Sequence, residues 1–196
     1  MGLTVANLLT VLRMALIPFF ILAVTDNRSG LALAIFAAAG ATDFLDGVIA
    51  RLWRQKTSLG AILDPMADKL LLTAAFVVLC VPDHPKALPD FVLLNRLPIS
   101  LVVLSISRDV IIALISAVLY VAGGRTSFKP TLLGKATTVV QVVTVVVVLL
   151  ANFRGVVSEW VPLLATLSMA MVLVSGLHYI YHAMRGAGSP EPDASS

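Results

Sequence analysis

Asp43-Phe-Leu-Asp46-Gly47-Val-Ile-Ala50-Arg51 and, eight residues later, Gly60-Ala-Ile-Leu-Asp64-Pro-Met-Ala-Asp68 are the two segments that decide the fold of this chain. Both lie in runs that are otherwise hydrophobic enough to cross a bilayer, where an ionised side chain is costly unless it is paired, binds a metal or faces water. On helices, Asp43 lies one turn from Asp46, and Asp64 lies one turn from Asp68. We therefore expect two antiparallel helices whose facing polar stripes bring the carboxylates together.

This carboxylate cluster needs a counter-charge, because unpaired carboxylates in a low-dielectric site repel one another and take up protons. Divalent cations remove the repulsion, and oxygen ligands without Cys or His favour Mg²⁺ or Mn²⁺. Two such ions suit displacement at a phosphorus centre. Gly47, Ala50 and Gly60 add no bulky side chains, and Arg51 offers a planar fork to phosphate oxygens. The residues alone predict a metal-dependent site for phosphorus chemistry.

The same residues carry a resemblance to a known family. The pattern Asp-x2-Asp-Gly-x2-Ala-Arg-x8-Gly-x3-Asp-x3-Asp is similar to the signature of the CDP-alcohol phosphotransferases. The opening Asn7-Leu-Leu-Thr10-Val-Leu-Arg13 also resembles bacterial phosphatidyltransferases of this family that make phosphatidylglycerophosphate or cardiolipin. The resemblance extends over about residues 5–185. It implies a CDP-diacylglycerol donor and CMP as the leaving group.

The resemblance also implies a role for each motif residue. Two Mg²⁺ or Mn²⁺ ions would be held by the four aspartates, Asp43, Asp46, Asp64 and Asp68. The CDP part of the donor would lie against Asp46, Gly47, Ala50, Arg51 and Gly60. Asp68 would be the general base that accepts the proton of the attacking hydroxyl. The alternative is that Asp68 is only a metal ligand and that the metal acidifies the hydroxyl.

The expected acceptor-binding residues are Arg108, Lys129 and Lys135, which would form an anion pocket for a phosphate. The alternative is that Arg108 only neutralises Asp109 inside its helix. Glycerol-3-phosphate is the first expected acceptor, because most bacterial relatives of this length use it. The second is phosphatidylglycerol, because Ser107-Arg108-Asp109-Val110 resembles the cardiolipin synthases and no second arginine follows at 110–116.

Composition indicates a membrane protein. Hydrophobic residues make up 59% of the chain and charged residues 13%, with a mean hydropathy of +0.97, outside the range of soluble domains. The predicted fold class is all-α, a polytopic integral membrane protein with six transmembrane helices: about 5–24, 31–52, 59–81, 98–122, 132–151 and 161–184. They form one membrane domain, residues 1–185, followed by a tail at 186–196 with the composition of disorder. We expect the first span to be retained, since Arg13 interrupts it and no basic region precedes it.

The loops predict the orientation, because six spans place both termini on the side of the motif. Basic residues on that side are Arg51, Arg54, Lys56, Arg125, Lys129, Lys135 and Arg185. The opposite side has fewer: Arg28, Lys86, Arg96 and Arg154. The positive-inside rule then predicts a protein of the cell (inner) membrane with its active site and both termini in the cytoplasm.

Several other features carry weaker expectations. His178 and His182 are one turn apart, as a metal pair would be, but an interfacial structural role is favoured because further ligands are missing. Arg13, with Asn7, is expected to be a structural partner at a helix end, and the alternative, a ligand-binding role, is kept for both residues and for Thr42. By resemblance, the protein is a homodimer in the lipid bilayer, and no nucleic-acid partner is expected. An ion-coupled transporter is the alternative class, although the sequence has no internal repeat and the charges gather at one face.

Overall fold

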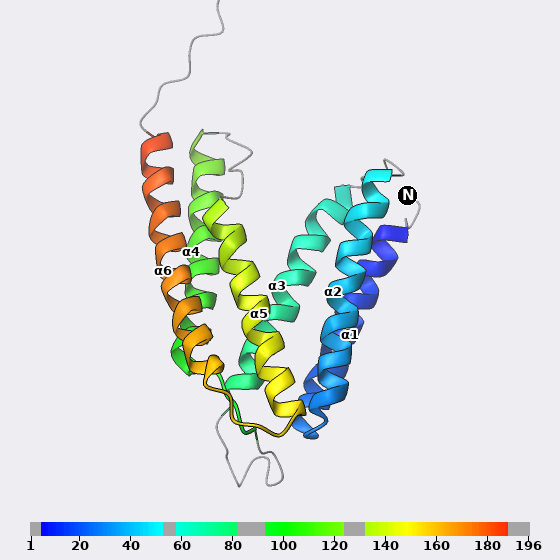
Figure 1. Cartoon of the computed structure of the whole chain (residues 1–196). Helices are drawn as coiled ribbons and strands as arrows, with labels where there is room; N and C mark the ends of the chain where they lie inside the picture. Colours follow the sequence, from blue (N-terminus) through cyan, green and yellow to red (C-terminus); the bar gives the residue numbers. More distant parts are fainter. Residues whose placement is uncertain (1–4, 53–57, 82–92, 124–131, 188–196) are drawn as a thin grey trace, which may run out of the picture.

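The computed structural model describes residues 5–52, 58–81, 93–123 and 132–187. These ranges contain six helices and no strand (Figure 1): α1 (Val5–Thr25), α2 (Ser29–Leu52), α3 (Ser58–Cys80), α4 (Ile99–Gly123), α5 (Leu132–Phe153) and α6 (Trp160–Ala187). The six predicted helices are confirmed, each with bounds within a few residues of those expected. Helix α6 continues into the segment expected to be a tail, and the remainder of that tail lies outside the described residues.

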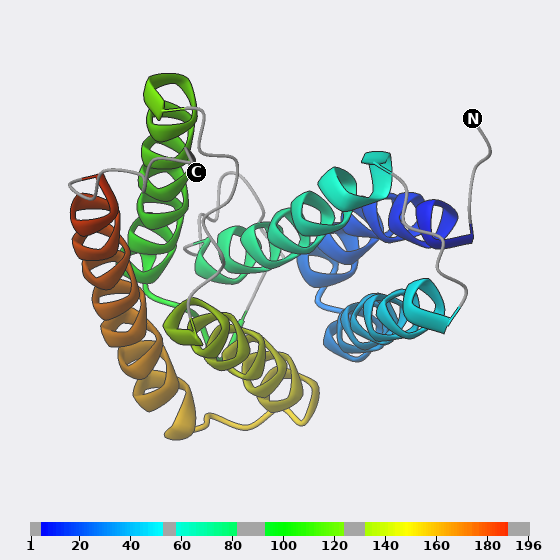
Figure 2. The same cartoon turned by 90° about the horizontal axis from the view of Figure 1, so that it is seen from above.

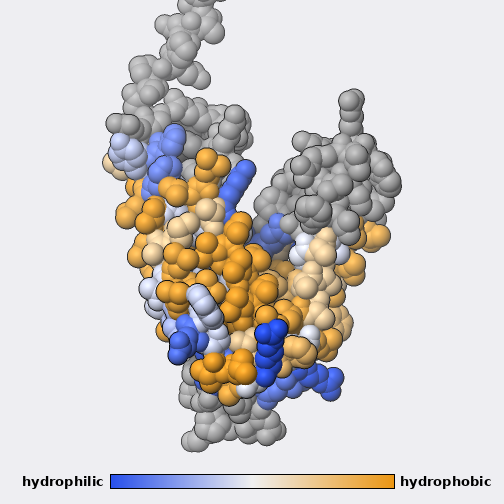
Figure 3. Space-filling model, viewed as in Figure 1, coloured by the Kyte–Doolittle hydropathy of each residue, from blue (hydrophilic) through white to orange (hydrophobic). Residues whose placement is uncertain are grey.

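The helices form where the sequence is continuously apolar, because in a bilayer the backbone must satisfy its hydrogen bonds within the segment. Among the described residues, four stretches are long and apolar enough to cross a membrane: Leu8–Thr25, Ile99–Val118, Leu132–Phe153 and Trp160–Met184. Helix α2 contributes a shorter apolar stretch, Ser29–Thr42. The protein is therefore an integral membrane protein, and the expectation of six spans is met in part. Figure 3 shows apolar residues over the middle of one face and hydrophilic residues toward both ends.

The six helices form two groups of three. Helix α1 packs along both α2 and α3, and α6 packs along both α4 and α5. Contacts of α2 with α5, and of α3 with α4 and α5, join the groups. The groups lie close together at the end where α1 runs into α2, and their axes diverge toward the end where α2 stops and α3 begins (Figures 1 and 2). We call these the closed end and the motif end.

The hydrophobic core lies toward the closed end. Its large buried members include Phe20 in α1, Leu79 in α3, Leu101 in α4 and Leu149 in α5. Phe20 also faces Phe36 of α2, with ring centroids 5.8 Å apart. Apolar groups gain little from leaving lipid, so close packing of this kind, with a few hydrogen bonds, is what holds membrane helices together.

A pair of asparagines ties two connections together at the closed end. The side chain of Asn152 in α5 accepts from the backbone N–H of Asn95 at 2.9 Å and donates to the Asn95 carbonyl at 2.9 Å. The buried side chain of Asn95 donates to the Val156 carbonyl at 2.7 Å and accepts from the Ser158 N–H at 2.8 Å. The segment before α4 is thereby fixed to the connection between α5 and α6.

Helices α2 and α5 approach closely at the same end because Gly30 has no side chain. A Cβ atom at Gly30 would lie 2.7 Å from two ring carbons of Phe153, inside van der Waals contact. The closed end is thus held by packing and hydrogen bonds, which leaves the motif end as the place where the two groups can enclose a cavity.

Candidate active site

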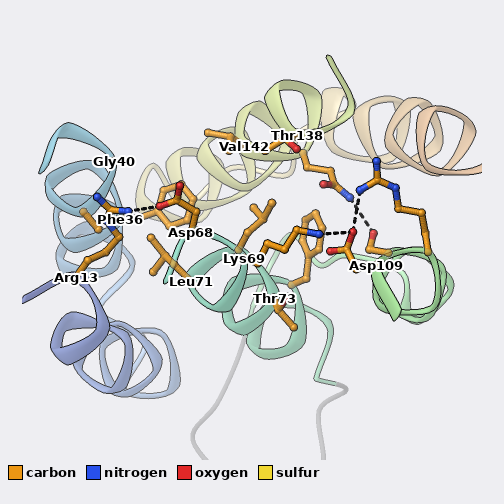
Figure 4. Close-up of a pocket in the computed structure, with 16 residues that line it drawn as sticks. Arg13, Phe36, Gly40, Asp68, Lys69, Leu71, Thr73, Asp109, Thr138 and Val142 are labelled. Carbon is orange, nitrogen blue, oxygen red and sulfur yellow. Dashed lines mark hydrogen bonds and ion pairs between the residues drawn. The ribbon is translucent and has the colours of Figure 1, made fainter. Parts of the chain in front are cut away.

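A cavity of about 180 Å³ lies between the two helix groups (Figure 4). One water needs only about 10–15 Å³ of such volume, so the cavity can take a polar group of many atoms. Its ionisable lining comes from α1, α3 and α4: Arg13, Asp68, Lys69, Arg108 and Asp109. Three of these described side chains are basic and two are acidic. The ionisable groups of the described lining therefore carry one positive charge in excess, beside apolar side chains such as Phe36 and Leu72.

Asp68 and Lys69 are successive residues of α3 that point to different sides of the cavity. Asp68 is directed toward α1 and α2, whereas Lys69 reaches toward α4 (Figure 4). This follows from helix geometry, because successive side chains are separated by about 100°. Helix α3 therefore carries ion-pairing groups to both helix groups.

On the first side, Nη1 of Arg13 forms an ion pair and hydrogen bond with Oδ1 of Asp68. Arg13 is 1% exposed, whereas the Asp68 side chain is 43% exposed. Arg13 thus lines the cavity and supplies a counter-charge for a motif carboxylate, which adds to the structural role at a helix end expected from the sequence. The available signal was the arginine itself, since a charge inside an apolar span requires a partner.

On the other side, Asp109 is shared by two basic groups. Its Oδ1 lies 2.7 Å from Nζ of Lys69 and accepts a hydrogen bond from Nη1 of Arg108 at 2.8 Å. Nη2 of Arg108 also donates to Oγ of Ser175 in α6 at 2.7 Å. The alternative considered from sequence, that Arg108 neutralises Asp109, is thus seen in the structure. Arg108 nevertheless lines the cavity, and its binding of an acceptor stays a prediction. Sequence reasoning missed Ser175, because a serine in an apolar helix carries no distinguishing signal.

The remaining motif residues are described only in their backbone. Asp43, Asp46, Gly47, Ala50 and Arg51 lie in the last turns of α2, and Gly60 and Asp64 lie at the start of α3. Their side chains lie outside the described part of the structure. The face of α2 that lines the cavity carries Phe36, Ala39 and Gly40, and Asp68 is the motif residue among the described lining. That the other motif residues face the same cavity stays a prediction.

The other predicted acceptor-binding residues are less fully defined. Lys129 lies outside the described residues. Lys135 is exposed in the first turn of α5, and Thr138, one turn later, lines the cavity. The convergence of Lys135 with Arg108 therefore stays a prediction.

The donor chemistry of the site fits a divalent cation. Within the described side chains, no group of three His, Cys, Asp or Glu residues gathers as a metal centre. Asp68, however, presents a hard oxygen donor to the cavity, and Asp64 precedes it by one helical turn. A carboxylate has about four acceptor positions on two oxygens, so a contact with Arg13 is compatible with a bond to Mg²⁺ or Mn²⁺. The position of Asp68 is therefore compatible with metal binding, and the roles of Asp43, Asp46 and Asp64 stay predictions.

The aromatic and histidine residues at the end of α6 are placed outside this site. The rings of His178 and His182 meet edge to face with centroids 6.1 Å apart, and no third ligand accompanies them among the described residues. Tyr179 is buried, and its hydroxyl lies 2.6 Å from Oγ of Ser116 in α4. Tyr179 therefore joins two helices, while Tyr181 is exposed.

The fold and the cavity define an all-α integral membrane protein with paired acidic and basic groups between its helices. Comparison with known proteins then identifies it further: the chain belongs to the CDP-alcohol phosphatidyltransferase family, whose family model matches residues 3–177. The resemblance inferred from the motif is confirmed.

Individual relatives divide between two activities. The chain is 35% identical to a cardiolipin synthase (CMP-forming) from Rattus norvegicus over 160 residues, which cover 72% of this chain and 48% of the relative. It is 36% identical to a CDP-diacylglycerol–glycerol-3-phosphate 3-phosphatidyltransferase from Escherichia coli K12 over 147 residues, covering 73% of this chain and 75% of the relative. A Pseudomonas fluorescens protein of the same description is 47% identical over 98 residues, covering 47% and 50%. The match therefore spans about half the length of the cardiolipin synthase and three quarters of the Escherichia coli protein.

Proposed function

We propose that the protein transfers the phosphatidyl group of CDP-diacylglycerol to a glycerol-type acceptor and releases CMP. The observation that carries the proposal is that Asp68, the last residue of the second motif segment, and Arg108 line one cavity from different helix groups. A carboxylate and a guanidinium in one cavity suit a hydroxyl that must lose a proton and a phosphate that must be held. Membership of the family supplies the CDP-linked donor.

In the proposed reaction, the acceptor hydroxyl attacks the phosphorus on the lipid side of the donor's pyrophosphate. A new phosphorus–oxygen bond forms there, the bond to the CMP oxygen breaks, and the hydroxyl proton passes to Asp68. Arg13 holds one oxygen of the Asp68 carboxylate and so fixes the direction in which the side chain faces the cavity. Because Asp68 is half exposed there, its carboxylate is accessible to an acceptor.

Some motif residues are proposed to bind the metal ions and others the CDP part of the donor. The proposed metal ligands are Asp43, Asp46, Asp64 and Asp68. Bound Mg²⁺ or Mn²⁺ would neutralise charge on the pyrophosphate and on departing CMP. The proposed CDP-binding residues are Asp46, Gly47, Ala50, Arg51 and Gly60. The glycines and Ala50 admit the nucleotide close to the helix backbone, and Arg51 offers two parallel hydrogen bonds to phosphate oxygens.

Glycerol-3-phosphate is our first candidate for the acceptor, bound by Arg108 with Lys129 and Lys135. The single positive charge in excess among the described ionisable lining groups favours an anionic acceptor, which both candidates are, so the order rests on how common glycerol-3-phosphate is among bacterial relatives of this length. Phosphatidylglycerol is the second candidate, because Ser107-Arg108-Asp109-Val110 resembles the cardiolipin synthases and relatives named as such cover most of this chain. We also propose, from the distribution of basic residues, that the motif end and both termini face the cytoplasm.

The proposed assembly is a homodimer within the bilayer, on the basis of the family resemblance alone. Crosslinking in native membranes should trap a dimer, and recovery of monomer only at every crosslinker length would contradict it. The chemistry proposed above does not depend on the dimer.

The test of the reaction is release of CMP by the purified protein in detergent with CDP-diacylglycerol and Mg²⁺, with each acceptor supplied separately. Chromatography of the lipid product identifies the acceptor. Asp64→Asn should abolish CMP release, whereas the control Asp26→Asn, in the exposed connection between α1 and α2, should not alter it. Product formed from phosphatidylglycerol alone would replace our first acceptor with the second. Absence of CMP with every glycerol acceptor would overturn the proposal.

A further inference from the structure

The side chain of Arg108 contacts two successive residues of α6, Ser175 and Gly176. Oγ of the buried Ser175 accepts a hydrogen bond from Nη2 of Arg108 at 2.7 Å. Beside it, a Cβ atom on Gly176 would lie 3.5 Å from Cγ of Arg108, so the α6 backbone runs along the stem of the arginine. The head and the stem of this side chain are thus both fixed by α6, which contributes no ionisable group to the described cavity lining.

The second contact of the guanidinium is ionic. Nη1 donates to Oδ1 of Asp109, and the same oxygen also pairs with Lys69. An arginine has five N–H donors in a rigid fork, and these two contacts occupy two of them. Nε of Arg108 is buried and finds no acceptor among the described residues. Nη1 and Nη2 each have a second N–H that these contacts do not use, so the fork keeps donors for an anion while two neighbours fix its plane.

The neutral character of Ser175 is important because it holds Arg108 without cancelling its charge. Asp109 carries one negative charge against the two positive charges of Lys69 and Arg108. A second carboxylate in place of the hydroxyl would bring this group to zero and remove its attraction for a phosphate. A serine hydroxyl gives a directed hydrogen bond and leaves one positive charge in excess.

We propose that Ser175 is a positioning residue for the acceptor: it fixes the Arg108 guanidinium in the orientation that binds the acceptor's phosphate. This inference rests on the proposed function. Ser175 acts through Arg108, and no contact with substrate is required of it. Without the hydroxyl, the Arg108 guanidinium turns fully toward Asp109. The Asp109 carboxylate then neutralises its charge, and the acceptor binds less tightly. The donor, at the motif segments of α2 and α3, is unaffected.

The test compares two serines of the same helix. Ser175→Ala removes the hydrogen bond to Arg108, and Ser168→Ala, two turns earlier in α6, removes a hydrogen bond of 2.9 Å between Ser168 and Thr144 of α5. Both serines are buried, so the structural cost of the two variants is matched. Steady-state rates of CMP release are measured while either the acceptor or CDP-diacylglycerol is varied. We expect Ser175→Ala to raise the acceptor KM by about tenfold, the equivalent of one hydrogen bond to a charged group, with the donor KM unchanged. Ser168→Ala should change neither.

A double variant shows whether Ser175 acts through Arg108. Arg108→Lys removes the fork, so adding Ser175→Ala to it should raise the acceptor KM no further. Ser175→Thr, which keeps the hydroxyl, should restore most of the acceptor affinity. If Ser175→Ala does not fold, Ser175→Cys provides the comparison, since its sulfur is only a weak acceptor.

The possible results distinguish a failure of the role of Ser175 from a failure of the proposed function. Equal acceptor KM values in Ser175→Ala and Ser168→Ala, with CMP still released, would overturn the role of Ser175 and leave the proposed function standing. A parallel rise in the donor KM, or additive effects in the double variant, would also overturn it, because either result describes a general structural defect. Absence of CMP from the unaltered protein would overturn the proposed function and this inference with it.

Discussion

Replacing Asp109 with asparagine removes the carboxylate that Lys69 and Arg108 share, and burial predicts that its two ion pairs contribute unequally to stability. The Lys69 side chain is 55% exposed and that of Asp109 is 33% exposed, so this pair resembles surface ion pairs worth about 0.2–1 kcal/mol. Arg108 is only 16% exposed, and its bond to Asp109 resembles hydrogen bonds to charged groups, worth about 1.5–3 kcal/mol. We therefore expect Asp109→Asn to lower the free energy of unfolding by about 2–3 kcal/mol, mostly through Arg108.

Double-variant cycles measure the two contributions separately. Unfolding of the protein in mixed micelles is followed by circular dichroism as the fraction of denaturing detergent is increased. The effect of Asp109→Asn should shrink by more than about 1 kcal/mol when Arg108→Met is already present, and by less than that when Lys69→Met is present. The control Asp26→Asn, the same substitution at an exposed connection, should stay within about 0.5 kcal/mol of the unaltered protein.

A coupling energy between Asp109 and Lys69 that equals or exceeds the coupling energy between Asp109 and Arg108 would contradict this prediction. That result would mean that exposure to the cavity does not weaken the pair, and that the cavity interior behaves as a low-dielectric medium. Coupling energies near zero for both pairs would show that Asp109 does not hold these groups in the folded protein.

Three further outcomes are expected elsewhere in the molecule. Asn152→Ala should lower the free energy of unfolding by about 2–3 kcal/mol, because it leaves the backbone N–H and C=O of Asn95 without their partners; CMP release per folded molecule should not change, since neither asparagine lines the cavity. Gly30→Ala should destabilise the protein by less than about 1 kcal/mol, because the Phe153 ring that the new methyl group meets is 60% exposed and can turn away, and any loss should disappear in a Phe153→Ala background. Removal of divalent metal with a chelator should stop CMP release, and added Mg²⁺ should restore it; activity that survives thorough chelation would contradict the proposed metal role of the aspartates.

The helices were the most predictable part of this structure. A predicted span at 31–52 corresponds to α2 at Ser29–Leu52, and one at 132–151 corresponds to α5 at Leu132–Phe153. The reason is physical: in a bilayer, hydrophobicity along the chain selects the segment, and internal hydrogen bonding makes it a helix. Neither step depends on which other helix lies beside it. Hydrophobicity along the chain also predicts the even number of helices and the position of the motif segments at the adjoining ends of α2 and α3.

The contacts between helices could not be predicted in this way. Arg13 and Asp68 are 55 residues apart, and their contact depends on the rotation of α1 against α3, which is set by packing over the whole interface. Arg108 was recognised because an arginine in an apolar span needs partners. Ser175, one of those partners, differs in no visible way from Ser168, which binds Thr144 instead. Polar residues of a membrane helix thus indicate that a partner exists, whereas the fold decides which one it is.

The distribution of packing and charge along the helices argues that the motif end is built for binding at some cost to stability. At the closed end, phenylalanine, leucine and valine side chains fill the space between the groups. At the cavity, the same helices meet through Arg13 with Asp68 and through Lys69 with Asp109. Each of these ion pairs has at least one partly exposed partner, so it stabilises less than well-packed apolar residues of similar size. Stability alone would favour apolar contacts along the full length of the bundle, so the charged walls are explained by a ligand that carries charge of its own.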